Sequence, residues 1–213
     1  MDVRMFTVGP VAENSYLFRL DGSDRALLVD PGEEADKLLG AIDALGVTLD
    51  GILLTHTHFD HIGAVAPVAR ATGAEVWVPE IEKMVLQDIN AYVPWPGFRP
   101  FENWDAEHTL RGGEKLELAG MEIDVIFTPG HSPGHVTFSV PAEQAIFSGD
   151  VLFQQSVGRV DLPGGDWPTL LESIRTLVDT LPPETTVYPG HMGTTTLGQE
   201  RATNPFLQEL ARG

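Results

Sequence analysis

The sequence predicts a mixed α/β (α+β) fold in which two β-sheets lie back to back and helices cover their outer faces. Two observations lead to this prediction. Each half of the chain contains a run of short apolar strands and a segment whose apolar residues have helical spacing. Polar motifs also follow several of the strands, as expected where a sheet edge carries a site. With 213 residues, 42% of them hydrophobic, we expect residues 1–213 to form one domain.

The N-terminal half begins with three strands and then alternates strands with helices. Turn signals such as Gly9-Pro10 and Asp21-Gly22 separate the first strands. The first helix has apolar residues at helical spacing and is closed by Gly46. The predicted strands are 3–8, 15–20, 25–29, 51–54 and 75–78, and the predicted helices are 35–45 and 62–71.

The C-terminal half contains a second run of strands and a longer helix. Leu170, Ile174 and Leu177 lie on one apolar stripe of that helix. Thr196-x-x-Gln199 has the form of a capping box, and Asn204-Pro205 fits the start of another helix, so two short helices should end the chain. The predicted strands are 116–118, 121–127, 136–140, 145–147 and 186–188, and the longer helix spans 167–181.

Residues 79–108 differ from the rest of the chain because aromatic and proline residues are concentrated there. We interpret this stretch as a lid or pocket rim that begins with a short helix. An ordinary insertion that buries its aromatic side chains explains the composition equally well. His108 also lies here, and for it we favour a structural hydrogen bond over a role as a metal ligand.

The segment His56-Thr57-His58-Phe59-Asp60-His61 directly follows the predicted strand 51–54. Imidazole and carboxylate are the ligands that zinc, iron and manganese take in the absence of thiolate, and this chain has no cysteine. Alternate residues of an extended loop share a face, so His56 and His58 should point to one position and Asp60 and His61 to another. The spacing therefore favours two metal ions over a solvated surface loop.

Three later polar residues also follow predicted strands. They are His131 in Gly130-His131, Asp150 in Gly149-Asp150 and His191 in Gly190-His191. Each of these residues alone fits a local structural role, because single histidines often satisfy only nearby hydrogen bonds. Together with the first loop, they are the natural completion of a metal site at one edge of the sheets.

Composition argues against several classes of partner. The formal net charge is −18, and no cluster of lysine and arginine interrupts it, so nucleic acid is not an expected partner. No apolar run approaches 18 residues and no signal-like leader follows Met1, so we expect no membrane association and a cytoplasmic location. A small-molecule substrate is the expected partner. The sequence does not predict the oligomeric state.

These motifs, in this order and spacing, resemble the metallo-β-lactamase superfamily of hydrolases, and the resemblance covers nearly the whole chain. It implies an αββα sandwich with outer helices. It also implies that Asp150 bridges two metal ions. The first ion would be held by His56, His58 and His131, and the second by Asp60, His61 and His191.

Within the superfamily, Gly158-Arg159-Val160-Asp161 and the tail from Thr195 to Arg201 with Asn204-Pro205 resemble compact bacterial enzymes of the glyoxalase II type. This resemblance implies a thioesterase that uses two divalent metal ions, with zinc favoured over iron or manganese, and a substrate of the S-lactoylglutathione type. The chain ends 22 residues after His191, without the basic helical domain of the larger glyoxalase II enzymes, so the physiological thiol is not predicted.

Three alternatives remain open at this stage. Persulfide dioxygenases share much of the ligand pattern and a Gly-Arg-x-Asp segment but use a single iron ion. A β-lactamase is less favoured, because those enzymes typically lack the Asp60 arrangement. A metal-binding module without catalysis would keep the ligands and have a blocked pocket.

The expected mechanism is attack on the thioester by a metal-bridging hydroxide. Asp60 is the predicted catalytic residue, because it would bind metal and orient the hydroxide. Thiolate is a good leaving group, so no strong general acid is required. Arg159 is the predicted substrate-binding residue, since a guanidinium can hold a carboxylate at two points. A structural ion pair with Asp161 is an equally supported role for Arg159.

Overall fold

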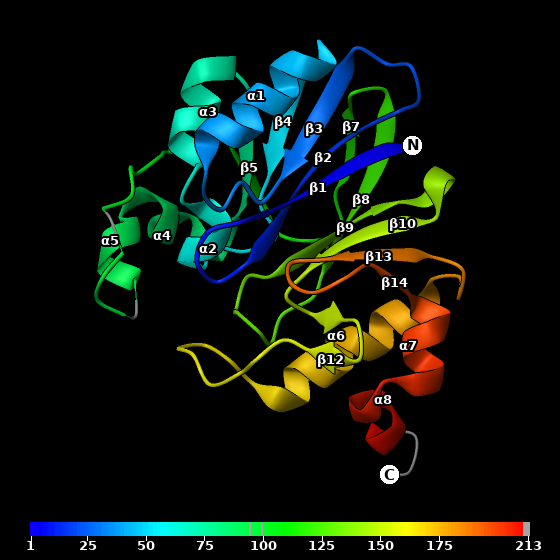
Figure 1. Ribbon diagram of the computed structural model, residues 1–213. Helices are drawn as coiled ribbons and strands as arrows, with labels where there is room; N and C mark the ends of the chain where they lie inside the picture. The colour runs from blue at the N-terminus through cyan, green and yellow to red at the C-terminus, as the bar shows by residue number, and fades with distance from the viewer. Residues whose placement is uncertain (94, 99, 211–213) are drawn as a thin grey trace.

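The computed structural model describes residues 1–93, 95–98 and 100–210, and it contains two six-stranded mixed sheets (Figure 1). The N-terminal sheet has the strand order β1 (Asp2–Val8), β2 (Glu13–Arg19), β3 (Arg25–Val29), β4 (Thr48–Leu53), β5 (Glu75–Pro79) and β6 (His108–Leu110). The C-terminal sheet has the order β14 (Thr195–Thr196), β13 (Thr186–Pro189), β10 (Ala145–Gly149), β9 (Val136–Val140), β8 (Met121–Phe127) and β7 (Lys115–Leu118). A separate hairpin pairs β11 (Leu152–Phe153) with β12 (Ser156–Val157).

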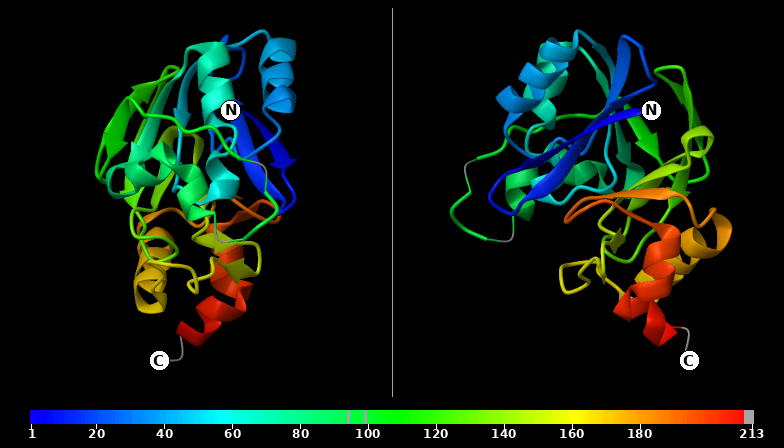
Figure 2. Two further views of the ribbon diagram at one scale, coloured as in Figure 1. Left: turned by 90° about the vertical axis from the view of Figure 1, so that its left-hand side faces the viewer. Right: turned by 45° about the vertical axis from the view of Figure 1, so that its right-hand side comes forward.

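Helices cover the outer face of each sheet, so the layers run helix, sheet, sheet, helix (Figures 1 and 2). The N-terminal sheet is covered by α1 (Ala35–Leu45) and α3 (Val65–Thr72), and the C-terminal sheet by α6 (Trp167–Thr180). The remaining helices are short: α2 (Phe59–Ile62), η1 (Glu80–Glu82), α4 (Lys83–Gln87), α5 (Ile89–Tyr92), η2 (Pro141–Glu143), α7 (Leu197–Thr203) and α8 (Pro205–Leu210).

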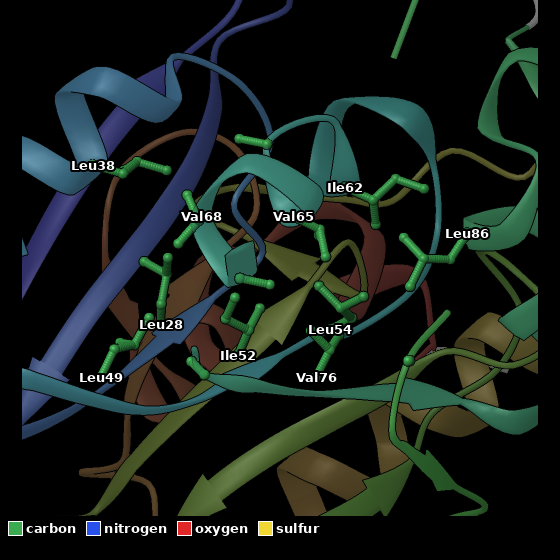
Figure 3. Close-up of a cluster of buried hydrophobic side chains, with 14 of the residues drawn as sticks. Leu28, Leu38, Leu49, Ile52, Leu54, Ile62, Val65, Val68, Val76 and Leu86 are labelled. Atoms are coloured by element: carbon green, nitrogen blue, oxygen red, sulfur yellow. The ribbon is translucent and has the colours of Figure 1, made fainter. Parts of the chain in front are cut away.

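Alternating side chains of the strands separate three hydrophobic clusters. In β3, Leu28 faces α1 and α3, while Leu27 and Val29 face the other sheet (Figure 3). In β10, Phe147 lies between the sheets, and Ile146 packs against α6. Strands buried on both faces are apolar at consecutive positions, which is why the sequence showed them as continuous apolar runs.

Strand direction explains where polar loops can meet. The strands β3, β4, β5 and β6 are parallel, as are β10 and β13, so the carboxyl ends within each parallel set lie at one edge. The loops after β4, β8, β10 and β13 gather there. This edge is the location that the sequence motifs predicted.

The layered α/β architecture confirms the predicted fold class, and the structure corrects several details. The predicted helix 62–71 is instead two helices, α2 and α3, interrupted at Gly63 and Ala64. A side chain at Gly63 would lie 2.5 Å from the carbonyl oxygen of Gly32, so the backbones are too close for a larger residue. The strand predicted to start at residue 51 begins at Thr48, and the β11–β12 hairpin was not predicted.

Residues 79–108 show features of both an ordinary insertion and a pocket rim. Phe98, Phe101 and Trp104 pack against the cluster under α1 and α3, as in an ordinary insertion. Trp95 remains 42% exposed beside Arg159. His108 belongs to β6, where its ring stacks on Trp77 and its Nε2 lies 2.7 Å from a carboxylate oxygen of Glu75.

A few sequence features fall outside the described residues, namely Pro94 in this stretch and the end of the tail at 211–213. The two short C-terminal helices are present, and the Thr196 side chain accepts a hydrogen bond from the amide of Gln199, as the capping box predicted. Within 1–93, 95–98 and 100–210, no helix has the length and apolar character needed to cross a membrane.

Candidate metal centre

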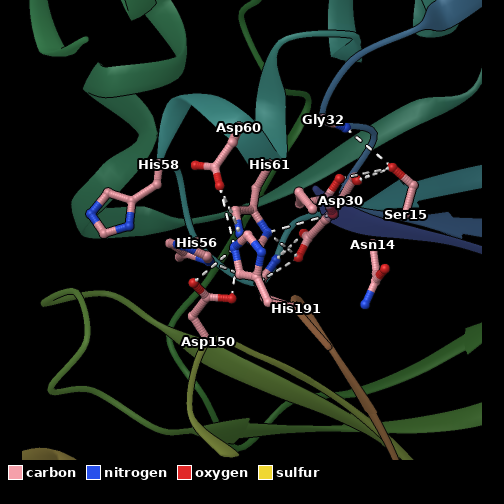
Figure 4. Close-up of polar contacts among 12 residues, drawn as sticks. Asn14, Ser15, Asp30, Gly32, His56, His58, Asp60, His61, Asp150 and His191 are labelled. Atoms are coloured by element: carbon pink, nitrogen blue, oxygen red, sulfur yellow. Dashed lines mark hydrogen bonds and ion pairs between the residues drawn. The ribbon is translucent and has the colours of Figure 1, made fainter. Parts of the chain in front are cut away.

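The seven predicted ligands lie together at one edge of the sandwich, and all of them except His131 are labelled in Figure 4. Four of them, His56, His58, Asp60 and His61, come from the loop after β4 and from α2. The other three follow three strands of the C-terminal sheet: His131 follows β8, Asp150 follows β10 and His191 follows β13. Both sheets therefore contribute to one site.

Two groups of three residues each present ligand atoms within 4.8 Å of one another. The first group is His56, His58 and His131, and the second is Asp60, His61 and His191. A third set of the same kind consists of Asp30, His56 and His61, and there Asp30 is already hydrogen-bonded to His61. The first two groups are the ligand sets that the resemblance implied.

Asp150 lies between these two groups. Its Oδ1 is 3.4 Å from Nε2 of His61, and its Oδ2 is 3.4 Å from Nε2 of His131 and 3.5 Å from Nε2 of His191. A side chain at Gly190 would collide with Asp150 Oδ1, so glycine at this position leaves room for the carboxylate. One carboxylate thus faces both ligand groups.

In His56, His61, His131 and His191, Nδ1 has a defined contact that orients the ring. Nδ1 of His61 contacts Asp30 at 3.0 Å, Nδ1 of His131 contacts the carbonyl oxygen of Arg159 at 2.7 Å, and Nδ1 of His191 contacts that of Ala12 at 3.2 Å. Nδ1 of His56 lies 3.0 Å from the Thr55 hydroxyl, which donates to Asp30. These contacts leave Nε2 facing the centre, as in metal-binding histidines generally.

His58 is turned the other way. Its Nδ1 lies 2.8 Å from Nε2 of His131, so two ring nitrogens converge from loops 73 residues apart in the sequence.

Several buried atoms of the cluster have no hydrogen-bond partner within the described part of the chain. They include Nε2 of His56, Nε2 of His61 and Oδ1 of Asp150. A buried polar atom without a partner is costly, and all three atoms belong to residues that face the centre. Imidazole and carboxylate donors that converge in this way fit divalent metal ions. The clusters and the fold together imply divalent metals.

The charges of the cluster keep its carboxylates ionised. Burial raises the pKa of Asp150, but the nearby rings of His61 and His131 outweigh it, and the pKa lies far below its ordinary value. Burial also raises the pKa of Asp60, and His61 and His191 more than offset it. Both carboxylates are therefore anionic at neutral pH.

The pKa values of the buried histidines are shifted in two opposite directions. Burial and the neighbouring His131 lower the pKa of His58 to about 4, and burial with the neighbouring His61 lowers the pKa of His56. For His61, burial also favours the neutral ring, but the carboxylates of Asp150 and Asp60 outweigh it and raise the pKa. A divalent cation would supply the positive charge that protonated His61 otherwise provides.

Arg159 lies at the exposed side of this centre. Its guanidinium forms two hydrogen bonds with Asp161, of 2.6 and 2.7 Å, and its central carbon lies 5.8 Å from the centre of the Trp95 ring. Both members of this ion pair are more than half exposed, so the pair contributes little stability. The guanidinium can exchange Asp161 for another carboxylate.

Four residues outside the predicted ligand set also support the site. Asp30 directly follows β3, as the other site residues follow their strands. His135 lies only four residues after His131 in the sequence; its Nε2 accepts a hydrogen bond from the amide of Asp150, and its ring stacks on His56. The other two, Asn14 and Glu82, come from elements that carry no recognisable motif.

Asn14 holds the turn that carries His191. Its side-chain amide donates hydrogen bonds to the carbonyl oxygens of Pro189 and Met192, at 3.2 and 2.8 Å. Its backbone amide donates to the carbonyl oxygen of Gly190. The β2 strand therefore fixes the backbone on both sides of a residue that lies far away in the sequence.

Comparisons with known proteins agree with this geometry. A family model described as the metallo-beta-lactamase superfamily matches residues 8–191. The hydroxyacylglutathione hydrolase GloC of Haemophilus influenzae is 35% identical, over 97% of this chain and 98% of its own length. The probable metallo-hydrolase YqgX of Bacillus subtilis is 40% identical, also over 97% of this chain and 98% of its own length.

Solved structures with the same architecture carry differing descriptions. The BLEG-1 B3 metallo-beta-lactamase superposes with a TM-score of 0.91 at 40% identity, covering 97% of this chain and 99% of its own. TTHA1623 in a di-iron-bound form has a TM-score of 0.85 at 42% identity, covering 96% of this chain and all of its own. ETHE1 from Myxococcus xanthus has a TM-score of 0.79 at 27% identity, covering 98% of this chain and 85% of its own.

Proposed function

Since this chain belongs to the metallo-β-lactamase superfamily, we propose that it is a metal-dependent thioesterase of the glyoxalase II type. Its substrate would be a thioester of a low-molecular-weight thiol. The observation that carries this proposal is the position of Asp150, whose two oxygens face His61 on one side and His131 with His191 on the other. A carboxylate placed in this way suits a pair of ions better than one.

The proposed ligands are the two groups described above, with Asp150 shared between them. His56, His58 and His131 would hold one ion, and Asp60, His61 and His191 the other. We favour zinc, because histidine and carboxylate are its usual ligands in hydrolases, and the relative TTHA1623 in a di-iron-bound form keeps iron as an alternative. When bound, such a pair lowers the pKa of a water molecule toward 7 and stabilises negative charge on a substrate oxygen.

The residues of the chain supply orientation and charge. Asp60 is anionic, nearly buried, and 3.4 Å from Nε2 of His191, so its carboxylate can orient the attacking water and accept a hydrogen bond from it. The leaving thiolate is the conjugate base of a thiol with a pKa near 8.5, so it departs without a strong general acid. Arg159 lies at the exposed side, where it can bind a substrate carboxylate.

Two other activities are tested beside thioester cleavage. Persulfide oxygenation is the alternative that the ligand pattern left open, and the structure described as BLEG-1 B3 metallo-beta-lactamase motivates a test for β-lactam hydrolysis. Oxygen chemistry at a single iron ion needs one ligand set with open positions, whereas here Asp60, His61 and His191 form a second set. GloC, described as a hydroxyacylglutathione hydrolase and 35% identical, supports the thioesterase proposal.

Metal analysis combined with three assays tests the proposal. The purified protein is analysed for zinc, iron and manganese. It is then assayed for cleavage of S-lactoylglutathione, for oxygen uptake with glutathione persulfide, and for hydrolysis of a chromogenic cephalosporin. We expect about two metal equivalents per chain and thioester cleavage without oxygen uptake. One iron per chain with persulfide-dependent oxygen uptake would overturn the proposal, and metal binding with none of the three activities would indicate a non-catalytic module.

A further inference from the structure

On the basis of the metal assignment in the proposed function, we infer that Glu82 is a positioning residue for the ion held by His56, His58 and His131. Glu82 ends the short helix η1, which carries none of the ligands. Its carboxylate joins the loop that contains His56 and His58 to the loop that contains His131. Nothing in the sequence pattern singles out this residue.

Four hydrogen bonds make this connection. Oε2 of Glu82 accepts from the backbone amide of Thr57 at 2.8 Å and from the Thr57 hydroxyl at 2.9 Å. Oε1 accepts from the Ser132 hydroxyl at 2.6 Å and from the backbone amide of Gly134 at 2.7 Å. Each oxygen thus binds one of the two loops.

The residues that donate these bonds are immediate neighbours of the ligands. Thr57 lies between His56 and His58 in the sequence, and Ser132 directly follows His131. Because Glu82 fixes both loops, it also fixes the separation of the His58 and His131 rings, whose facing nitrogens are 2.8 Å apart. The contacts leave little room for adjustment, since a side chain at Gly134 would lie 2.8 Å from Cγ of Glu82.

Glu82 is a buried carboxylate whose charge is stabilised by hydrogen bonds. The residue is 4% exposed, and within the described part of the chain it forms no ion pair. Burying a carboxylate is costly unless hydrogen bonds replace its water, and here four donors do so.

Glutamine cannot reproduce these contacts. One backbone amide points at each oxygen of Glu82, and neither of these N–H groups can rotate. A glutamine amide in either orientation therefore places its NH₂ group against the N–H of Thr57 or of Gly134. Glu82→Gln keeps the size of the side chain and releases one of the two loops.

Glu200 provides a matched control. It is also buried, and it accepts hydrogen bonds from the backbone amide of Gln155, the hydroxyl of Thr195 and the side chain of Asn204. These contacts join α7 to the β11–β12 hairpin and involve no proposed ligand. Glu200→Gln therefore measures the effect of losing a buried carboxylate that forms no hydrogen bond with the loops of His56, His58 and His131.

The experiment compares metal affinity in the wild type, Glu82→Gln and Glu200→Gln. Metal-free protein is titrated with zinc in competition with a chromophoric chelator, and cobalt(II) absorption spectra report the ligand geometry. We expect Glu82→Gln to lower the affinity for the ion held by His56, His58 and His131 by about 10- to 100-fold, the usual effect of removing an outer contact of a ligand. The variant should also alter the cobalt spectrum. Glu200→Gln should lower the melting temperature of the metal-free protein and leave both affinities and the spectrum as in the wild type.

A milder pair of variants covers the case in which Glu82→Gln does not fold. Ser132→Ala removes one hydrogen bond to Glu82, and Thr195→Ala removes one hydrogen bond to Glu200. Only Ser132→Ala should weaken metal binding. Wild-type metal affinity in the Glu82 and Ser132 variants, or an equal loss in the Glu200 and Thr195 variants, would overturn the inference.

These outcomes are distinct from failure of the proposed function. If the wild type binds metal but cleaves no thioester, the proposed function fails, and the affinity comparison still tests Glu82. If the wild type cleaves the thioester and Glu82→Gln binds metal normally, only the role of Glu82 fails. A wild type that binds no metal would overturn both.

Discussion

Asp30→Asn should weaken metal binding through a change in the protonation of His61. The Asp30 carboxylate accepts three hydrogen bonds: Oδ1 accepts from the backbone amide of Thr55, and Oδ2 accepts from the Thr55 hydroxyl and from Nδ1 of His61. The Thr55 amide cannot rotate away, so asparagine keeps its oxygen there and turns its NH₂ group toward His61. Nδ1 of His61 then faces a donor instead of an acceptor, so the neutral ring favours its proton on Nε2, the atom that faces Asp60 and Asp150.

The size of this effect follows from the role of the contact. Nε2 of His61 can bind a metal ion only through its lone pair, so in the metal-bound state the ring carries its proton on Nδ1, against the asparagine NH₂ group. Losing an outer contact of this kind usually costs about 10- to 100-fold in metal affinity, which corresponds to about 1.4 to 2.7 kcal/mol. The hydrogen bond from the backbone amide of Thr55 to the side-chain oxygen at position 30 is kept, so the metal-free protein should still fold.

Competition titration with a chelator measures the affinity, and ¹H–¹⁵N correlation spectra of the histidine rings identify which nitrogen carries the proton. Asp50→Asn is the control, because the Asp50 side chain is only 7% exposed and accepts hydrogen bonds from Arg25 and the amide of Ala119, far from the ligands. If Asp30→Asn binds metal as tightly as the wild type while Nδ1 of His61 remains protonated, the reasoning from hydrogen-bond geometry is wrong.

Four further predictions test the site. Asp60→Asn should lower kcat/KM for the thioester at least about 100-fold, which is about 2.7 kcal/mol of barrier; wild-type turnover would exclude Asp60 from catalysis. Arg159→Lys should raise KM without changing the melting temperature, whereas a lower melting temperature with normal KM would support the structural pair with Asp161. Metal binding at pH 7 should release protons, because nearby carboxylates raise the pKa values of His61 and His191 despite burial. Calorimetry in buffers of different ionisation enthalpy measures this release. For the same reason the metal-free protein should lose stability as the pH rises above about 6.5, since a raised pKa stabilises the fold only while the ring stays protonated; a melting temperature that rises over this range would contradict the charge assignment.

The sequence was sufficient to predict residues whose signal is local. The strands of the two cores are apolar over consecutive positions, and the ligands His56, His58, Asp60 and His61 follow one of them directly. His131, Asp150 and His191 could be added because each follows a strand after a glycine, where the chain can turn sharply.

The remaining site residues could not be predicted because their partners are remote in the sequence. Asn14 acts on a turn more than 170 residues away, and Glu82 acts on two loops that lie 25 and about 50 residues from it. The break between α2 and α3 has a similar origin, since it depends on the close approach of Gly63 to the backbone of Gly32. Periodicity describes which face of an element is buried, but it does not describe which distant group meets that face.

The contribution of both sheets to one ligand cluster also bears on how the folded chain resists opening. His58 and His131 face each other across 73 residues of sequence, and the chain has no cysteine that could form a disulfide. Coordination by both halves would act as a cross-link in place of a disulfide, and closing a loop of this length by a covalent bridge is worth about 4 to 5 kcal/mol in the chain-entropy model. Separation of the two sheets would then require release of the ions first, so the rate of unfolding should follow the rate at which a chelator removes metal.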